Sequence, residues 1–127
     1  MSHFTTLKTR MVSKDHLLQA LQDLGMTYET GDLEIRGYQG IKTQVDVKVA
    51  SANAEYEIGF RKIGDAYEIV ADWYGITDIR REEFLAKVTQ RYAYRVALEQ
   101  LQAQDFVVVS QETSPDNTIH ITLRRMV

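Results

Sequence analysis

Cysteine is missing from this chain of 127 residues. Disulfide bonds, thiolate metal sites and thiol nucleophiles are therefore excluded. No run of apolar residues is long enough to span a membrane, and the longest such cluster is FVVV at 106–109. The opening MSHFTTLKTR lacks the apolar core and the small-residue cleavage site of a signal peptide. We therefore expect a soluble protein of the cytoplasm, or of the stroma if an organelle encodes it.

The chain also has only a small excess of negative over positive charge. The formal net charge is −3 and the sequence pI is about 5.6, which argues against nucleic acid as the main partner. Hydrophobic residues make up 44% of the chain, which is enough to build a core without disulfide bonds or bound metals. Charged residues make up 26%, which is typical of a folded soluble protein. No linker, low-complexity stretch or charge block divides the chain, so we expect a single domain over 1–127.

Two helices are predicted by apolar spacing. Ser13 stands where a helix N-cap would, leucines follow at helical spacing, and Gly25 marks the expected end. A long helix is expected over 80–103, with Asp78 as its N-cap and a broad apolar stripe along one side. The stripe consists of Leu85, Val88, Tyr92, Ala93, Val96, Ala97 and Leu101.

Strand patterns fill most of the remaining sequence. Segment 26–37 reads either as one broken strand or as a tight hairpin around Gly31 and Asp32. A turn around Pro115, in SPDN, joins the last two strands. The other expected strands span 3–11, 43–50, 56–63, 66–73, 105–113 and 117–126.

The register of the hairpin formed by 56–63 and 66–73 can be deduced from the sequence. Gly64 and Asp65 form a two-residue loop between the strands. Closing the strands on this loop places Glu57 opposite Asp72, and a slip of one residue would mix apolar and charged side chains on both faces. One face then holds only apolar or aromatic residues: Tyr56, Ile58, Phe60, Ile69, Ala71 and Trp73.

These elements predict an α+β fold. An antiparallel sheet of about seven strands has both helices, one short and N-terminal and one long, packed on one face. The order helix, strand, turn, strand in 17–37 is weakly echoed in 96–124. Few residues are identical between the two stretches, so an internal duplication stays open.

The usual catalytic motifs are missing. RGYQG has neither the spacing nor the Lys-Ser/Thr ending of a phosphate-binding loop, and no serine lies in a nucleophile elbow. His3, His16 and His120 have no metal-ligand spacing, although His3 and His120 could meet if the terminal strands pair. We therefore expect no catalytic residue, no metal and no cofactor.

Glu57 and Asp72 are the most unusual pair, because like charges directly across a ladder cost about 0.2–1 kcal/mol. Three interpretations stay open: a site with one raised pKa, a cation site, or a structural pair balanced by Lys48 or Arg124. The structural interpretation is favoured.

Two surfaces are candidates for binding. The segment QRYAYR at 90–95 places Arg91 and Tyr94 off the apolar stripe of the long helix, where they could recognise an anion or a partner. The outer face of the sheet would display charged and polar side chains of mixed sign. The candidate binding residues there are Glu57, Arg61, Asp72, Tyr74, His120 and Arg124.

Four stretches resemble one family: MSHFTTLKT, YEIGFRKIGDAYEIVADWYGI, QRYAYRVALEQL and IHITLRRMV. It is the cyanobacterial and algal-plastid family named after the hypothetical chloroplast reading frame thirty-five, a domain of unknown function. The resemblance runs nearly end to end and implies a protein of a photosynthetic cell. It supplies no activity and no site residue.

Three functions are consistent with these features. The leading one is an accessory protein that binds another protein or itself, in assembly or regulation of the photosynthetic apparatus. The second is a small-molecule or anion-binding module between the long helix and the sheet, walled by Tyr92, Tyr56 and Trp73, with Arg61 or Arg91 fixing the ligand. The third is an acid–base hydrolase that uses Glu57 and Asp72.

Overall fold

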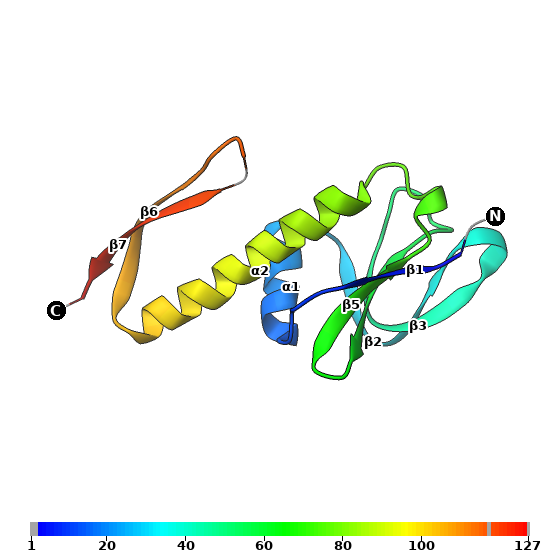
Figure 1. Ribbon diagram of the computed structural model, residues 1–127, viewed down its shortest axis with the longest axis horizontal. Helices are drawn as coiled ribbons and strands as arrows, with labels where there is room; N and C mark the ends of the chain where they lie inside the picture. Colours follow the sequence, from blue (N-terminus) through cyan, green and yellow to red (C-terminus); the bar gives the residue numbers. More distant parts are fainter. Residues whose placement is uncertain (1–2, 117, 127) are drawn as a thin grey trace.

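The computed structural model describes residues 3–116 and 118–126 and forms two helices and seven strands (Figure 1). In chain order they are β1 (Thr5–Lys8), α1 (Lys14–Asp23), β2 (Tyr28–Arg36), β3 (Lys42–Val49), β4 (Ile58–Ile63), β5 (Ala66–Ala71), α2 (Arg81–Ala103), β6 (Phe106–Thr113) and β7 (Ile119–Arg125). Two single 3₁₀ turns, η1 (Tyr38–Gly40) and η2 (Trp73–Gly75), lie between strands and before α2. The predicted α+β fold is confirmed.

Helix α1 starts and stops at the predicted residues. The Ser13 hydroxyl accepts a hydrogen bond from the His16 amide at 3.4 Å, as an N-cap does. At the other end Gly25 has a φ of +70°, a left-handed conformation that glycine adopts without steric cost. The Gly25 amide donates to the Gln22 carbonyl at 3.0 Å and the Met26 amide donates to the Leu21 carbonyl at 3.0 Å. This is the Schellman pattern that ends many helices.

Five strands form one antiparallel sheet in the order β1-β5-β4-β3-β2. The predicted register of the β4–β5 hairpin is confirmed, since Phe60 pairs with Ile69 and Ile63 pairs with Ala66. The paired residues end at Ile58 and Ala71, so the expected continuation of the ladder to Glu57 and Asp72 does not form. The chain leaves the strand there and enters η2.

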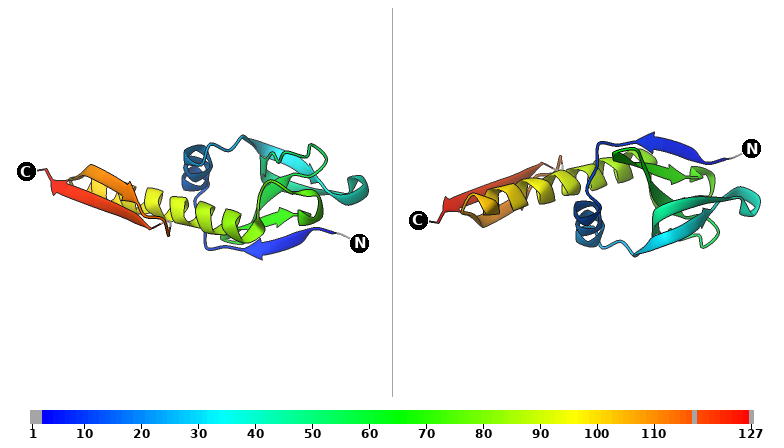
Figure 2. Two further views of the ribbon diagram at one scale, coloured as in Figure 1. Left: turned by 90° about the horizontal axis from the view of Figure 1, so that it is seen from above. Right: turned by 90° about the horizontal axis from the view of Figure 1, so that it is seen from below.

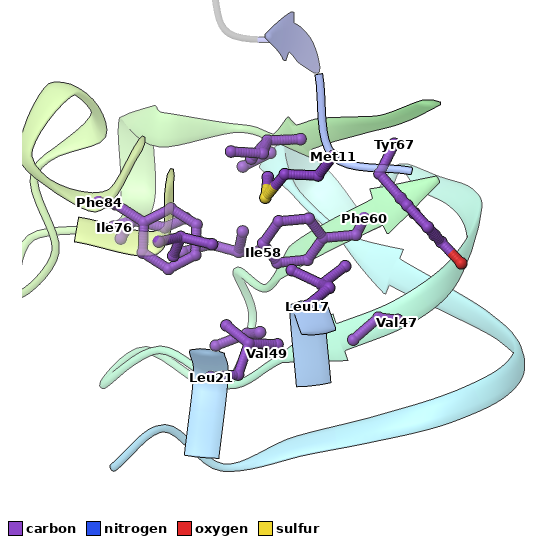
Figure 3. Packing of buried hydrophobic residues seen from close by; sticks show 13 residues of the cluster. Met11, Leu17, Leu21, Val47, Val49, Ile58, Phe60, Tyr67, Ile76 and Phe84 are labelled. Atoms are coloured by element: carbon purple, nitrogen blue, oxygen red, sulfur yellow. The ribbon is translucent and has the colours of Figure 1, made fainter. Parts of the chain in front are cut away.

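The main core lies between one face of this sheet and both helices (Figure 3). Leu17 and Leu21 of α1 and Phe84 and Val88 of α2 are almost completely buried against it. Each such side chain contributes about 1.5–3 kcal/mol when it leaves water. The sheet supplies the face predicted from the hairpin, and the helices cover that one face as expected. The sheet side of the core contains Val47, Val49, Ile58, Phe60, Tyr67, Ile69 and Ala71.

The opposite face of the sheet is not the open polar surface that the sequence predicts. Val70 is 1% exposed there, in a second apolar cluster with Ile35 and Val45 from the β2–β3 hairpin. A shift in the β2–β3 register between Thr30 and Leu33 marks a bulge, which bends a strand. Because Ile35 and Val45, from the β2–β3 end of the same sheet, pack over Val70, part of the outer face is core.

Gly59 makes this second packing contact possible. It pairs with Val70 in the ladder, and a Cβ atom at this position would lie 2.3 Å from the Val45 Cγ1 atom. Real Cβ atoms do not approach other carbon atoms so closely, so the Val45 side chain can lie over β4 at this position only because residue 59 has no side chain.

The last part of the chain extends beyond the sheet. The end of α2 and the β6–β7 hairpin lie at the far end of the molecule from the five-stranded sheet (Figures 1 and 2). We refer to residues 89–126 as the C-terminal arm. Of the arm residues that the structure describes, none is buried, although many are apolar.

Several local expectations need correction. The seven strands form two sheets, of five and two strands, because β6 and β7 pair only with each other. The N-cap of α2 is Arg80, and Asp78 instead accepts a hydrogen bond from the Ala52 amide at 3.1 Å.

Segment 28–36 is one bulged strand and the residues around Gly31 make no turn. The stretch 17–37 therefore contains helix residues and one strand, whereas 96–124 contains helix residues and two strands. Asn117 of the predicted turn lies outside the described residues.

The close approach of Val45 to Gly59 can be tested by adding a side chain at position 59. Gly59→Ala should lower the free energy of unfolding by about 1–3 kcal/mol, because the new methyl group overlaps the Val45 side chain. Urea denaturation of the single variants and of Gly59→Ala with Val45→Ala measures the coupling. The double variant should be more stable than the sum of the single effects by more than about 0.5 kcal/mol. Simple additivity would show that the two residues do not share one space.

Candidate functional site

Asp72, Trp73 and Tyr74 follow directly after β5 and hold the end of that strand in place. The Asp72 carboxylate is 1% exposed and accepts hydrogen bonds from the Tyr38 amide at 2.9 Å and the Tyr74 amide at 3.2 Å. It therefore caps η2 and ties it to the β2–β3 connection. Trp73 packs toward the core, with its ring 6.2 Å from that of Phe84, as the sequence predicts.

Tyr74 is the exposed member of this group. The residue is 71% exposed, and its ring packs edge-on against Tyr38 at 5.7 Å and at a tilt against Tyr56 at 6.5 Å. Burial, followed by the nearby charge of Asp72, raises the pKa of the Tyr56 hydroxyl. The Tyr56 hydroxyl is therefore a neutral group in this packing around the capped strand end.

Glu57 is buried in a different network. Its carboxylate accepts hydrogen bonds from the Arg36 amide at 3.0 Å and from the Arg36 Nε atom at 3.2 Å. Lys48 adds an ion pair at 3.3 Å, so Lys48 is the balancing neighbour and Arg124, on β7, is not. A carboxylate that accepts this many charged and backbone donors is satisfied structurally. Glu57 and Asp72 are thus placed by separate partners, which gives the proposed hydrolase pair no support.

Arg61 lies on the outer face among charged neighbours. Its guanidinium donates to the Thr43 hydroxyl at 3.4 Å and lies 3.8 Å from the Glu68 carboxylate, the residue opposite it in the ladder. Asp46 is close by and accepts from the Lys62 amide at 2.8 Å. These contacts balance the cation within the sheet, as expected for cross-strand pairs of opposite charge.

The candidate residues on the long helix connect α2 to other parts of the molecule. Arg91 Nε donates to the Asp23 carboxylate at 3.1 Å, and Arg95 adds two contacts to the same group at 2.7 and 2.5 Å. The Arg91 guanidinium also lies 4.5 Å above the Tyr94 ring. The Tyr94 hydroxyl donates to the Gln111 side chain at 2.5 Å. QRYAYR therefore holds α1 and β6 to α2.

The other two candidates, His120 and Arg124, are on β7 and not on the five-stranded sheet. They pair with Glu112 and Val107 of β6. The eight predicted residues consequently occupy three regions, the five-stranded sheet with its strand ends, the long helix and the β6–β7 hairpin, and the structure does not bring them into one site.

A polar chain that the sequence reasoning missed connects α1 to α2. The Ser13 hydroxyl and the His16 Nδ1 atom are 2.7 Å apart, and the other ring nitrogen of His16 contacts the Glu99 carboxylate. The Tyr92 hydroxyl accepts hydrogen bonds from the Val12 amide at 3.0 Å and the Ser13 amide at 2.9 Å. The spacing of Ser13 and His16 was visible as one helical turn, but nothing local in the sequence points to α2.

The Tyr92 contact fixes the segment between β1 and α1 beside the long helix. Nearer β1, the Thr9 hydroxyl donates to the Tyr67 carbonyl at 2.5 Å, and the Tyr67 amide donates to the Met11 carbonyl at 2.8 Å. Residues 8–11 are therefore held between β5 and α2, where they form a wall beside the long helix.

An apolar groove runs between this wall and α2. Two hollows that share Arg10 and Thr89 join end to end along the helix. The ligand pocket predicted from the sequence was to be lined by Tyr92, Tyr56 and Trp73. Of these three residues, Tyr92 lines the hollows, whereas Tyr56 and Trp73 pack against the main core and do not line them. We call this feature the long-helix groove. Its residues are Lys8, Thr9, Arg10, Met11, Glu82, Leu85, Ala86, Thr89, Gln90, Tyr92, Ala93, Val96, Ala97 and Gln100.

The predicted apolar stripe of α2 is thus divided between different surroundings. Val88 is buried on the sheet, whereas Leu85, Ala93 and Val96 line the open groove. The sequence identifies these residues as apolar but cannot say which of them the sheet reaches.

Within residues 3–116 and 118–126, no group of three or more His, Asp and Glu side chains is placed to hold a metal ion. In the same residues, no helix is long and apolar enough to cross a membrane.

The Asp23 cluster gives a pH-dependent prediction. Hydrogen bonds from Arg95, and then from Arg91, hold the pKa of Asp23 below its ordinary value of 3.8. A depressed pKa contributes stability that is present above the unfolded value and is lost as the pH falls through the folded value.

Asp23→Asn should therefore lower the free energy of unfolding by about 1 kcal/mol at neutral pH. The difference from wild type should shrink as the pH falls below the ordinary value of 3.8 and vanish once Asp23 is protonated in the folded protein, as urea denaturation across pH would show. Asp65→Asn, in the exposed β4–β5 turn, is the control and should show no such difference. A difference that is the same at low pH would contradict the ion-pair account.

Comparison with known proteins places the chain in a family. A family model described as a protein of unknown function (DUF1257) matches residues 20–122. The chain is 35% identical over 128 residues to the uncharacterized protein ycf35 of Guillardia theta, with 98% of both chains covered. It is 30% identical over 128 residues to that of Pyropia yezoensis and 29% identical over 126 residues to that of Cyanophora paradoxa, again with 98% of each covered. No solved structure matches it.

The match to relatives over nearly the whole chain confirms the family resemblance noted in the sequence, and these homologues are plastid-encoded. The chain belongs to the ycf35 family, described as proteins of unknown function (DUF1257).

Proposed function

We propose that this chain is an accessory protein that binds an amphipathic helix of another protein in the long-helix groove. The observation that supports this most directly is an apolar groove along α2 with two exposed cations on its rim, Lys8 and Arg10. The algal relatives favour a partner in the assembly or regulation of the photosynthetic apparatus.

The shape of the groove suits a helix. Its α2 wall runs from Glu82 to Gln100, which at 1.5 Å per residue is about 27 Å. Small side chains such as Ala93 and Ala97 let a second helix approach closely, and Leu85 and Val96 supply apolar contact. An amphipathic helix would lay one apolar side along this wall, with anchors every three or four residues.

The charges on the rim define the polar flank of the occupant. Lys8 and Arg10 lie on the wall opposite α2, and the single carboxylate in the lining, Glu82, is at one end of the groove. Arg10 lines both hollows and therefore lies near the middle. A partner helix with Asp or Glu beside its apolar side would complement these cations, which favours orientation and rate of association.

Two synthetic peptides test this proposal. Both are helices of about 18 residues with the same apolar side, one flanked by glutamates and the other by lysines. Fluorescence anisotropy should show that the acidic peptide binds at least about tenfold more tightly.

Variants of the protein then locate the binding site. Val96→Glu should abolish binding, because it places a carboxylate on the apolar α2 wall of the long-helix groove. Lys8→Glu with Arg10→Glu should reverse the preference between the peptides. The matched control is Lys42→Glu with Lys62→Glu, which makes the same charge change at exposed positions outside the groove lining and should bind as wild type does. Equal binding of both peptides, or binding that Val96→Glu leaves intact, would contradict the proposal.

A further inference from the structure

The C-terminal arm carries more apolar surface than its own contacts cover. Val109 is 51% exposed and Met126 is 56% exposed, and the other large apolar side chains of the arm are only partly buried. A hairpin of two strands is at best marginally stable in water, because it cannot bury enough apolar surface. The partly buried apolar residues of the arm outside the long-helix groove are Leu98, Leu101, Phe106, Val107, Val108, Ile119, Ile121 and Leu123.

The two outer edges of this hairpin differ in charge. Strand β7 carries His120, Arg124 and Arg125, and charged residues on an edge discourage further pairing. Strand β6, FVVVSQET, carries one charged residue, Glu112. The β6 edge is therefore the edge of this hairpin that another strand can join at the least electrostatic cost.

We propose that β6 pairs antiparallel with β6 of a second copy of this chain, which makes a four-stranded sheet across a twofold axis. A twofold axis joins identical surfaces and closes the assembly at two copies. The proposal concerns a different surface from the long-helix groove and does not depend on it.

The register follows from the alternation of side chains. In each hairpin Val107 pairs with Arg124, Val108 pairs with Leu123 and Gln111 pairs with Ile121, so the bulge between Val108 and Ser110 fixes which residues share a face. Residues that face each other across the two β6 strands must have their side chains on the same face of the sheet. This condition is met when the twofold axis lies between Val109 and Ser110, with Gln111 opposite Val108 and Glu112 opposite Val107 of the second copy.

This register places opposite charges together. Arg124 is the cross-strand neighbour of Val107, on the same face. Glu112 of one copy then lies across Val107 from Arg124 of the other, within reach of two long side chains. The two Glu112 carboxylates lie at opposite ends of the paired strands, so they do not repel. Charge complementarity of β6 and β7 therefore favours a second copy as the partner.

Sedimentation of the full chain over a range of concentrations tests for the dimer. The wild type should change from 14.6 kDa to twice that mass as concentration rises. Val109→Glu should shift this equilibrium to monomer, because it places a carboxylate at the centre of the paired strands. Val96→Glu, in the groove, is the control and should dimerise normally. A wild type that is monomeric throughout, or a dimer that Val109→Glu leaves intact, would overturn the proposal.

Charge reversal distinguishes the proposed register from other dimers. Glu112→Arg alone brings two arginines together at each contact, and Arg124→Glu alone brings two glutamates together. Each should weaken self-association by about tenfold or more. Mixing the two variants should restore a heterodimer, because both of its contacts then have opposite charges. Circular dichroism checks that each variant is folded. A mixture that stays monomeric while both variants are folded would contradict the register.

Discussion

The long helix α2 is longer than the sheet that supports it. It has 23 residues, and only Phe84 and Val88, both in its first half, are buried. The apolar pattern nevertheless continues to Leu101, so the second half of the helix carries apolar residues that the sheet does not reach. The groove and the arm both result from this difference in length.

Polar contacts hold the unsupported half of α2 where apolar burial does not. Asp23 of α1 binds Arg91 and Arg95, His16 binds Glu99, and the Tyr92 hydroxyl holds the segment before α1. Each contact is directional and reaches one neighbouring element. Polar pairs at a surface are individually weak, so they orient the helix more than they stabilise it. One side of α2 is left uncovered, and this is the side that faces the wall formed by residues 8–11.

Local features of the fold could be predicted because local chemistry determines them. The Gly64-Asp65 turn and strict alternation set the β4–β5 register, and Ser13 and Gly25 set the ends of α1. Trp73 was identified as a core residue for the same reason.

The features that could not be predicted depend on contacts between distant segments. Alternation puts Asp72 on the outer face, but it cannot show that the Tyr38 amide comes from another hairpin to bury it. A bulge in β2 lets that hairpin cover Val70, and bulges have only a weak sequence signal. The same alternation of polar residues fits one sheet of seven strands or two separate sheets. Residues that the sequence places on one face therefore lie in three separate regions of the structure.

The five-stranded sheet and its helices have a buried core of their own, whereas the β6–β7 hairpin is completed by association. Amide hydrogen exchange, followed residue by residue at low and high protein concentration, distinguishes these two parts of the molecule. Protection of β4 and β5 should be independent of protein concentration, and protection of β6 should rise with it. If β6 is instead as strongly protected as β4 at every concentration, the hairpin is stable without a partner and association does not complete it.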